Sequence, residues 1–456
     1  MRKHRILVSM GLLCVFCCVA CPGWVEAQYK PYASYPEDPD HVVSLIFIHH
    51  STGEHWLADD YGGLALALMN SGYFVSDTNY GWGPDSIGDN TDIGYWWTWF
   101  RGPKSATYTS ALYAESGQHY GASFDDSVYT RLSKSPGGPN QVIMFKSCFP
   151  NSALKGSPND PIPPINSNQL RDQGADSDYH TVANAKGIYI DLLNYFNTRQ
   201  DKLFIVITAP PLIKPTYASN ARAFNQWLVN NWLTDYPYRN VFVFDFYNIH
   251  TSNGGSADTN DLFLSSGNHH RWWKGVFQHL VQLPSNVEVY PTGDDHPSRA
   301  GNLKATGEYI KLLDYAYNRW QDLNGPLDNN ALTFATGGNA GWFGESVAGY
   351  WVFGGSAAQS GAISNSQSSW LQTSVKGPGT LKFYWRVSSQ PNRDFLRLLV
   401  DNKEAAKISG NTTWAQVTKT IGTTGNHTIQ WVYQKGASGS GGLDAGWVDQ
   451  VEWTSP

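Results

Sequence analysis

Five continuous apolar runs, separated by segments with helical periodicity, organise the first two thirds of this chain. The runs cover residues 43–49, 73–77, 141–146, 203–208 and 241–246. A strand that is apolar along its whole length must be buried on both faces, and a parallel sheet covered by helices on both sides buries it in this way. We therefore expect an α/β domain with a doubly wound parallel sheet.

Helical patterns lie between the apolar runs and complete the alternation. They cover residues 61–70, 183–198, 221–232 and 300–320. In the first of them, Leu64, Ala65 and Leu68 fall on one face of a helix. In doubly wound domains the active residues lie on loops at the carboxyl ends of the strands. Polar residues that directly follow an apolar run are therefore the candidates for a functional site.

The composition of the chain changes after residue 320. A polar segment rich in Gly, Pro and Asn covers residues 324–330, and short β-prone runs separated by Gly, Ser and Asn turns follow it. The sequence thus predicts an α/β domain over 28–323, a linker over 324–330 and a jelly-roll β-sandwich over 331–456. Because the linker is polar, we expect the two domains to fold separately.

The first 27 residues have the pattern of a secretory signal peptide. Arg2, Lys3 and Arg5 precede an apolar stretch, and a small-residue cleavage site ends at Ala27. A lipoprotein anchor at Cys21 is the alternative. No later run is long enough to span a bilayer, so we expect a secreted or periplasmic protein rather than an integral membrane protein.

The charge and the aromatic content narrow the class of partner. The chain has 38 acidic and 32 basic residues, a formal net charge of −6, and no basic runs, which argues against a nucleic-acid partner. Its 19 tryptophans are explained either by core packing or by contact with carbohydrate, whose C–H faces stack on flat indole rings. Cys148 is the one cysteine after the predicted cleavage site, so no intrachain disulfide is expected.

Three residues at opposite ends of the α/β domain form a candidate hydrolytic site. Ser51 follows the first apolar run, and Asp294 and His296 immediately precede the last predicted helix. A nucleophilic hydroxyl needs a base, and the base needs a partner that fixes its tautomer. The alternative is structural, because Ser51 could cap the helix that follows it, and Asp294 and Asp295 could cap the last helix.

With these residues in this order, residues 42–320 resemble the SGNH, or GDSL-like, hydrolase superfamily. The resemblance implies that Ser51 is the nucleophile, that His296 is the general base and that Asp294 orients it. The sequence departs from the family pattern where His49-His50 replaces the usual Gly-Asp before the nucleophile. The spacing Asp-x-His is found in some polysaccharide-acetylating and deacetylating relatives.

The same resemblance implies an oxyanion hole built from two further loops. The backbone N–H of Gly81 or Gly83, after the second apolar run, would be one donor. The side-chain amide of Asn151, after the third run, would be another, although the usual Gly-x-Asn-Asp motif is absent. Each preorganised donor to the oxyanion contributes ~3 kcal/mol to the stabilisation of the transition state.

Two aromatic stretches are candidates for a substrate surface. Residues 92–101 are rich in tryptophan, and residues 252–292 form a long insertion just before Asp294. We interpret them as walls of a sugar-binding cleft, while an aromatic core that braces a loop is the alternative. The predicted substrate-binding residues are His50, Trp96, Trp97, Trp99, Trp272 and Trp273.

The C-terminal domain resembles a jelly-roll module of bacterial secreted proteins, of the MAM-like or carbohydrate-binding type. Gly341-Trp342-Phe343 and the segment from Asp444 to Asp449 carry this resemblance. Related modules bind glycans or proteins, and some hold a structural calcium, for which Asp444 and Asp449 are candidate ligands. We expect no cofactor to be required.

The sequence therefore predicts an exported serine esterase that removes O-acyl groups, O-acetyl groups in particular, from a polysaccharide. One alternative is a non-catalytic glycan-binding protein on the same scaffold, and another is a nucleophilic Cys148. A third is a glycoside hydrolase with a carboxylate pair drawn from Glu54, Asp89, Asp92 and Asp294. A metal site, which we do not expect, would draw its ligands from His49, His50, His269, His270, Asp294 and His296.

Overall fold

The computed structural model describes residues 38–39, 41–119, 128–236, 238–252, 269–273, 276–281, 284–345 and 349–456. Residues 271–273 and 276–278 are described as backbone only. The predicted signal peptide and the candidate lipid anchor at Cys21 lie outside the described residues. No helix in the described ranges has both the length and the apolar character needed to cross a membrane.

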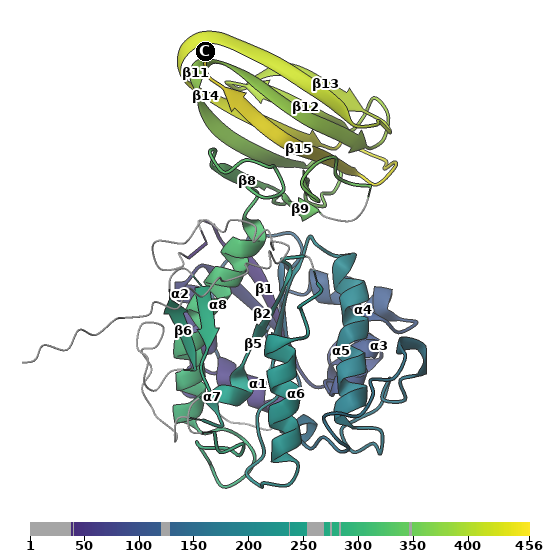
Figure 1. The fold of residues 1–456 in the computed structure, drawn as a ribbon, viewed down its shortest axis with the longest axis vertical. Coiled ribbons are helices and arrows are strands. Elements are labelled where there is room, and N and C mark those ends of the chain that lie inside the picture. Colours follow the sequence, from purple (N-terminus) through teal and green to yellow (C-terminus); the bar gives the residue numbers. More distant parts are fainter. Residues whose placement is uncertain are drawn as a thin grey trace, which may run out of the picture.

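A five-stranded parallel sheet forms the centre of the N-terminal domain (Figure 1). The strand order is β2-β1-β3-β4-β5, which is the flavodoxin-like order of a doubly wound sheet. The predicted fold class is confirmed, and each of the five apolar runs forms one strand. Their bounds are β1 Val43–Ile48, β2 Tyr73–Thr78, β3 Val142–Lys146, β4 Leu203–Ile207 and β5 Val241–Phe244.

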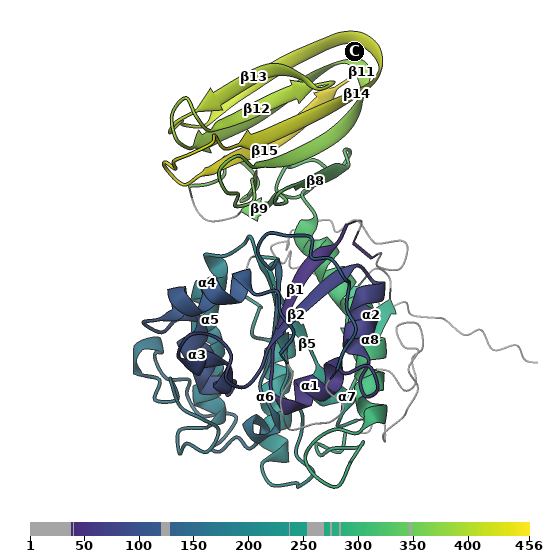
Figure 2. The same cartoon turned by 180° about the vertical axis from the view of Figure 1, so that it is seen from behind.

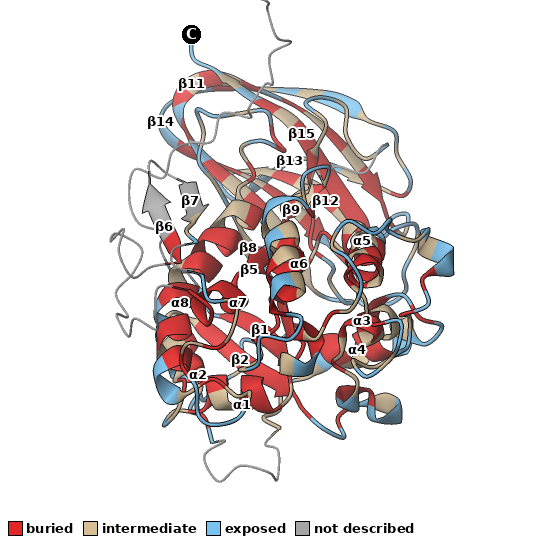
Figure 3. Cartoon of the chain, turned by 60° about the horizontal axis from the view of Figure 1, so that its bottom comes forward, coloured by how far each residue is buried: buried red, intermediate tan, exposed pale blue. Residues whose placement is uncertain are grey.

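Helices cover both faces of this sheet because successive strand residues point to opposite sides. Ile46 and Ile48 enter one core, and Leu45 and Phe47 enter the other. The first face is covered by α3 Ile93–Phe100, α4 Ser105–Ala114, α5 Val182–Asn197 and α6 Ala218–Asn230. The second face is covered by α1 Ser51–Leu57, α2 Leu64–Asn70, α7 Phe246–Ile249 and α8 Arg299–Gln321 (Figure 2). The strands are buried along almost their whole length (Figure 3).

Short elements occupy the long connections of this domain. The 3-10 helix η1 Pro84–Asp89 follows β2, and η2 Phe149–Ser152 and η3 Ile165–Ser167 follow β3. The hairpin of β6 His270–Trp273 and β7 Val276–His279 lies within the predicted insertion before Asp294. These connections, rather than the sheet, bring polar side chains to the edge where β1 and β3 end.

The C-terminal domain is a curled antiparallel sheet that folds into a sandwich. Two long strands, β11 and β14, pair along their length, and their register shifts between Gly377 and Gly379. The first half of β11 pairs with β8 and the second half with β15, so one strand contributes to both layers. The strands are β8 Phe334–Gly338, β9 Phe343–Glu345, β10 Ala357–Gln359, β11 Ser368–Ser388, β12 Phe395–Val400, β13 Lys403–Ser409, β14 Ala415–Gln434 and β15 Ala445–Thr454.

The segment predicted as a polar linker packs on the sandwich. Leu323 and Leu327 are buried in the sandwich core, together with residues of β11 and β15. The backbone of Leu327 accepts a hydrogen bond from the amide of Val451 at 2.9 Å, and the Asn329 side chain donates to the carbonyl of Val451 at 2.7 Å. Leu327 lies within the predicted linker and Leu323 is the last residue of the predicted α/β domain, and the side chains of both enter the sandwich core.

Candidate active site

Ser51 stands at the carboxyl end of β1, as the first residue of α1. Its Oγ lies 2.9 Å from Nε2 of His296, and only 8% of the residue is exposed. The N-cap of α1 is His50, and no side-chain hydrogen bond caps this helix. Ser51 therefore does not cap α1, and the structural alternative for this residue is wrong.

Asp294 holds the other side of the His296 ring. Asp294 Oδ1 lies 3.2 Å from Nδ1 of His296 and also accepts hydrogen bonds from the His296 backbone N–H at 2.8 Å and from Thr292 Oγ1 at 2.9 Å. The backbone hydrogen bond from His296, more than any other cause, lowers the pKa of the Asp294 carboxyl below its usual value. The carboxylate is therefore charged at neutral pH and can stabilise a protonated His296.

The neighbouring aspartate has a different role. Asp295 Oδ1 accepts a hydrogen bond from the backbone N–H of Ile213 at 2.7 Å, which ties the His296 loop to the loop after β4. The N-cap of α8 is Ser298, so neither aspartate caps that helix. Two rings further restrict His296, since those of Phe149 and His55 approach it edge-on at 4.9 and 5.5 Å.

His49 and His50 follow β1 directly and have different surroundings. His49 is buried, its Nε2 lies 3.1 Å from Asp77 Oδ2, and its Nδ1 lies 2.9 Å from the carbonyl of His50. His50 is half-buried beside Ser51, with Nε2 2.7 Å from the carbonyl of Gly88. Burial lowers the pKa of His50 to about 4, so its ring is neutral at neutral pH.

The two loops predicted to form the oxyanion hole are engaged elsewhere. The amide N–H of Gly81 donates to Asp89 Oδ1 at 2.7 Å. The side-chain nitrogen of Asn151 donates to Asp92 Oδ1 at 2.6 Å and to the carbonyl of Cys148 at 3.3 Å. Both hydrogens of the Asn151 amide are thereby used, so the structure does not present this side chain to Ser51.

Gly83 remains as the backbone candidate of the predicted oxyanion hole. It is exposed, and its φ of 78° lies in the region that favours glycine. A Cβ at this position would approach Ile87 Cγ2 at 3.1 Å, so the loop is closely packed around it.

Sequence reasoning missed Tyr80, although it named the glycine that follows it. The ring of Tyr80 stacks on His50, with centroids 3.8 Å apart and an angle of 23° between the planes. The ring therefore lies beside the residue that directly precedes Ser51. The signal available in the sequence was its place directly after β2, at the same sheet edge as Ser51.

Cys148 also lies beside the nucleophile. Its Sγ is 3.8 Å from Ser51 Oγ and 2.9 Å from Thr52 Oγ1, and the thiol is buried. The His296 ring contacts Ser51 Oγ at 2.9 Å, so the serine is the group that the base reaches first.

The predicted aromatic wall is wrong for two of its tryptophans. Residues 93–100 form the helix α3, in which Trp96 and Trp99 are fully buried. The indole N–H groups of these residues donate to Ser147 Oγ and to the carbonyl of Asn90, so they belong to the core alternative. Trp97 is half-buried and packs against the guanidinium of Arg171 at 5.0 Å. The side chains of Trp272 and Trp273, in β6, lie outside the described residues.

The carboxylates of the glycosidase alternative are held in structural hydrogen bonds. Glu54 is buried and accepts from the Asn79 side chain at 2.9 Å. Asp89 accepts from the amide of Gly81, and Asp92 accepts from the Asn151 side chain and from the amide of Ala175. Each of the three is held by amide donors, Glu54 and Asp92 by donors from other segments of the chain, which does not suit a proton-transferring pair.

The metal and calcium candidates have other partners in the described ranges. His269 and His270 both bind the buried carboxylate of Glu308, at 2.9 and 2.7 Å. In the sandwich, Asp444 pairs with Lys435 at 2.6 Å, and Asp449 accepts from the backbone of Val352 and Phe353. No group of three or more His, Cys, Asp or Glu suited to hold a metal is found in the part of the chain that the structure describes.

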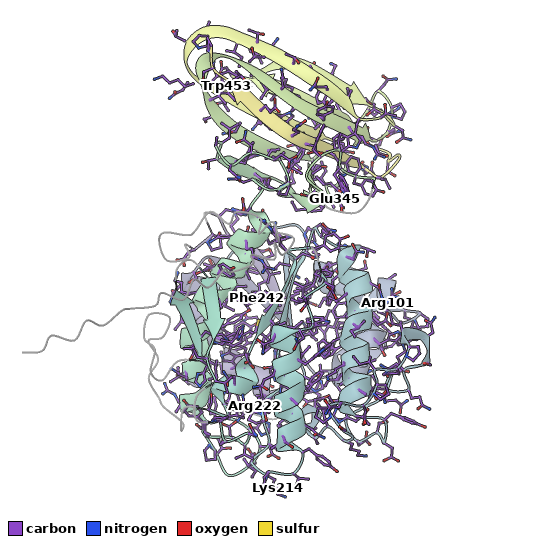
Figure 4. The ribbon with its side chains drawn as sticks, viewed as in Figure 1. Arg101, Lys214, Arg222, Phe242, Glu345 and Trp453 are labelled. Atoms are coloured by element: carbon purple, nitrogen blue, oxygen red, sulfur yellow. The ribbon has the colours of Figure 1, made fainter. Side chains whose placement is uncertain are left out.

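The candidate site and the sandwich lie at opposite ends of the α/β domain. Ile213, which binds Asp295 next to His296, precedes Lys214, and Figure 4 shows Lys214 at one end of the molecule and Glu345 beside the junction with the sandwich. Helix α8 begins three residues after His296 and spans 23 residues, or about 34 Å. A cavity of about 350 Å³ lies at the junction, between Ser44, Gln141 and Trp320 on one side and Thr336 and Trp370 on the other, away from Ser51.

Comparisons with known proteins give partial structural similarities. No family model and no curated protein matches the chain. The TmCBM61 module in complex with β-1,4-galactotriose has a TM-score of 0.23 and 14% identity, over 30% of this chain and 97% of that one. The secreted serine protease VesC from Vibrio cholerae has a TM-score of 0.21 and 20% identity, over 25% of this chain and 24% of the protease. A family two carbohydrate esterase from Clostridium thermocellum has a TM-score of 0.16 and 12% identity, over 22% of this chain and 27% of the esterase.

Proposed function

We propose that this chain is a serine esterase that removes O-acyl groups, O-acetyl groups in particular, from a polysaccharide. The observation that carries the proposal is the hydrogen-bonded series from Ser51 Oγ to His296 Nε2 at 2.9 Å and from His296 Nδ1 to Asp294 Oδ1 at 3.2 Å. A hydroxyl, an imidazole and a carboxylate in this order are the parts of a nucleophilic acyl-transfer site.

The reaction assigns one task to each of the three residues. His296 Nε2 takes the proton of the Ser51 hydroxyl while Oγ bonds to the ester carbonyl carbon, and the carbonyl oxygen becomes an oxyanion. The oxyanion collapses, the ester C–O bond breaks, and His296 gives its proton to the departing sugar oxygen. Water then attacks the acyl-serine with His296 again as base, which releases the carboxylic acid and restores Ser51. Asp294 remains ionised throughout and stabilises the imidazolium.

The surroundings of Ser51 favour a short acyl group on a large alcohol. Ser51 is 8% exposed and lies close to Cys148 and His296, which leaves little room on the acyl side. Tyr80 is 51% exposed and is held flat on His50, so it presents aromatic surface next to the nucleophile. An acetyl group on a sugar ring suits this division between a tight side and an open aromatic side.

The position of the sandwich favours an anchoring role rather than a share in the chemistry. It follows α8, so its core begins about 34 Å, the length of that helix, from the His296 loop. A module at this distance raises the local concentration of a polymeric substrate without touching the bond that is cleaved.

The test is acetate release by the purified chain from an O-acetylated polysaccharide, together with hydrolysis of p-nitrophenyl acetate. Ser51→Ala should lower kcat by about 10⁴- to 10⁶-fold, since the nucleophile is lost and the fold is not. Ser374→Ala, at an exposed serine of β11, is the matched control and should keep full activity. If Ser51→Ala hydrolysed esters at an unchanged rate, the nucleophile would be Cys148 or a carboxylate and not Ser51.

A glycan-binding protein without catalysis is the second candidate. The observation in its favour is that two of the predicted oxyanion-hole donors have other acceptors. The Gly81 N–H binds Asp89, and the side-chain amide of Asn151 binds Asp92 and the carbonyl of Cys148. Polysaccharide binding by the purified chain, with no ester turnover above that of Ser51→Ala, would establish this second function.

A further inference from the structure

We propose that the cavity at the junction of the two domains is a binding site for a short neutral saccharide, separate from the site at Ser51. Ser44 near the amino end of β1 and Gln141 just before β3 line this cavity, whereas Ser51 follows the carboxyl end of β1. The proposal goes beyond the esterase function and does not depend on it, because it concerns binding at the opposite edge of the sheet.

Both domains contribute walls to the cavity. Strands β8 and β9 of the sandwich face the α/β domain (Figure 1). The end of α8 is held on both sides of the junction, since Arg239 Nη1 lies 3.1 Å from Asp322 Oδ2 and Leu323 enters the sandwich core. The cavity volume of about 350 Å³ falls within the range of about 300–1,000 Å³ that is usual for ligand sites, and such sites are frequent where domains meet.

Aromatic side chains from both domains line the cavity. Tyr317 and Trp320, near the end of α8, are almost fully buried, and the Trp320 N–H donates to the carbonyl of Gln200 at 2.9 Å. On the sandwich, a Cβ at Gly337 would lie 2.5 Å from Cζ2 of Trp370, so the indole packs directly on this glycine. Trp370 is half-buried, and the rest of its ring lines the cavity. A flat aromatic surface of this kind suits the C–H face of a sugar ring.

The polar groups that a ligand would meet include three side-chain amides, those of Gln141, Gln321 and Asn339. Gln141 Oε1 is buried, and no donor among the described residues hydrogen-bonds it. A buried acceptor without a donor is unfavourable, so a hydroxyl group placed there by a ligand would bind well. An amide both donates and accepts, as sugar hydroxyl groups do.

The charged side chains of the lining already have partners. Asp201 accepts from Nε and Nη2 of Arg199 at 2.8 and 2.7 Å, and Lys202 Nζ lies 3.6 Å from Asp201 Oδ2. Apart from His41, the lining residues within the described ranges carry no further carboxylate, ammonium or guanidinium group. The cavity therefore suits a neutral ligand with hydroxyl groups and C–H faces better than an anionic one.

The test is isothermal titration calorimetry of the full chain with neutral trisaccharides of glucose, xylose, mannose and galactose, and with trigalacturonic acid as an anionic probe. At least one neutral trisaccharide should bind, and trigalacturonic acid should bind at least about tenfold more weakly. Ser51→Ala should bind as wild type does, because Ser51 lies at the other sheet edge. Absence of binding by every neutral trisaccharide at millimolar concentrations, or tighter binding of the acid, would overturn the proposal.

Two variants place the binding in the cavity. Trp370→Ala should weaken it by about tenfold or more, as the loss of an anchoring tryptophan does. The matched control is Trp453→Ala, at a half-buried tryptophan that Figure 4 shows at the end of the sandwich away from the junction. In Gly341→Leu, the new Cβ would lie 3.5 Å from Thr336 Cγ2 and 3.7 Å from Gln321 Oε1, which are ordinary contact distances. The leucine should fill the cavity and abolish binding.

Gln141→Leu separates recognition from folding. It removes an oxygen without a hydrogen-bond partner, so Tm should not fall, while saccharide affinity should drop by about fivefold or more. Unchanged affinity in both Trp370→Ala and Gly341→Leu would show that the saccharide binds elsewhere on the chain, and would overturn the proposal. A chain that binds the saccharide in this cavity and hydrolyses no ester would overturn only the esterase function.

Discussion

His296 Nε2 lies 2.9 Å from Ser51 Oγ, although 245 positions separate the two residues in the chain. Ser51 follows strand β1, which lies between β2 and β3, and His296 lies in the loop that leads into α8. The two meet because strands of a parallel sheet end at one edge, and because Asp295 ties the His296 loop to the backbone after β4. The pair is thus a product of the sheet topology and of one loop-to-loop hydrogen bond.

Asp294→Asn should separate the electrostatic role of Asp294 from its structural one. An asparagine oxygen can still accept from Thr292 and from the His296 backbone, so the loop should keep its shape. The negative charge at Nδ1 of His296 is lost, and kcat should fall by at least about 10²-fold; a buried aspartate in this position contributes about 10⁴-fold. The measurement is kcat for p-nitrophenyl acetate at neutral pH. Asp295→Asn, which can still accept from Ile213, is the control, and equal activity in both variants would contradict the role of Asp294.

Asn151→Ala should lower stability as well as activity. The Asn151 oxygen accepts the buried N–H of Ile93 at 2.8 Å, and its nitrogen holds Asp92. Losing these partners should cost about 1–3 kcal/mol of unfolding free energy. Asn151→Asp should be less stable still, because it places a second carboxylate against Asp92. Urea unfolding of both variants measures these changes in stability. A large loss of kcat in Asn151→Ala at unchanged stability would show that Asn151 is an oxyanion-hole donor after all.

A chain that ends at Gln321 should keep its rate on small soluble esters. Every residue of the proposed chemistry precedes that point, and α8 separates the site from the sandwich. On insoluble acetylated polysaccharide the same truncation should lose activity, through lost local concentration at the surface. Equal loss on both substrates would mean that the sandwich supports the catalytic fold instead.

The isolated sandwich tests where the second domain begins. A fragment that starts at Asp322 keeps Leu323 and Leu327, both buried in its core, whereas one that starts at Asn330 loses them. The longer fragment should therefore have the higher Tm, by several degrees, since each buried leucine contributes about 1.5–3 kcal/mol. Equal Tm values would show that residues 322–329 do not stabilise the sandwich, and residues 324–330 would then be a linker only.

Asp449→Asn should make the sandwich more stable at neutral pH. Burial raises the pKa of Asp449 to about 6, above the value of 3.8 for a free aspartate. The folded state therefore holds the proton more tightly, so stability falls as the pH rises from about 4 to about 6 and is level above that. An asparagine oxygen can still accept from Val352 and Phe353, so the variant should gain up to about 3 kcal/mol at pH 8 and lose this pH slope.

Thermal unfolding of the isolated sandwich against pH measures this effect. Glu452→Gln, at an exposed position of the same strand, is the control and should keep the slope between pH 4 and 6. If added calcium raised the Tm of wild type and Asp449→Asn abolished that increase, Asp449 would be a calcium ligand, and the charged carboxylate would be required.

The sequence alone determined the strands, their alternation with helices, and the position of Ser51 at a strand end. Burial on both faces leaves a continuous apolar run, and a strand end is where such a run stops, so both are readable locally. The helix α3 was missed because its tryptophans face the sheet and their density resembled an exposed binding surface.

Only the tertiary structure decided what the polar and aromatic side chains near the site do. The partners of Asn151 come from residues 92, 93 and 148, and the ring of Tyr80 stacks on that of residue 50 across the sheet edge. Leu323 and Leu327 enter a core whose buried residues lie up to 124 positions further on, counted from Leu327 to Val451. A hydrogen-bond donor can serve one acceptor at a time, and that choice depends on distances between loops that no local pattern encodes.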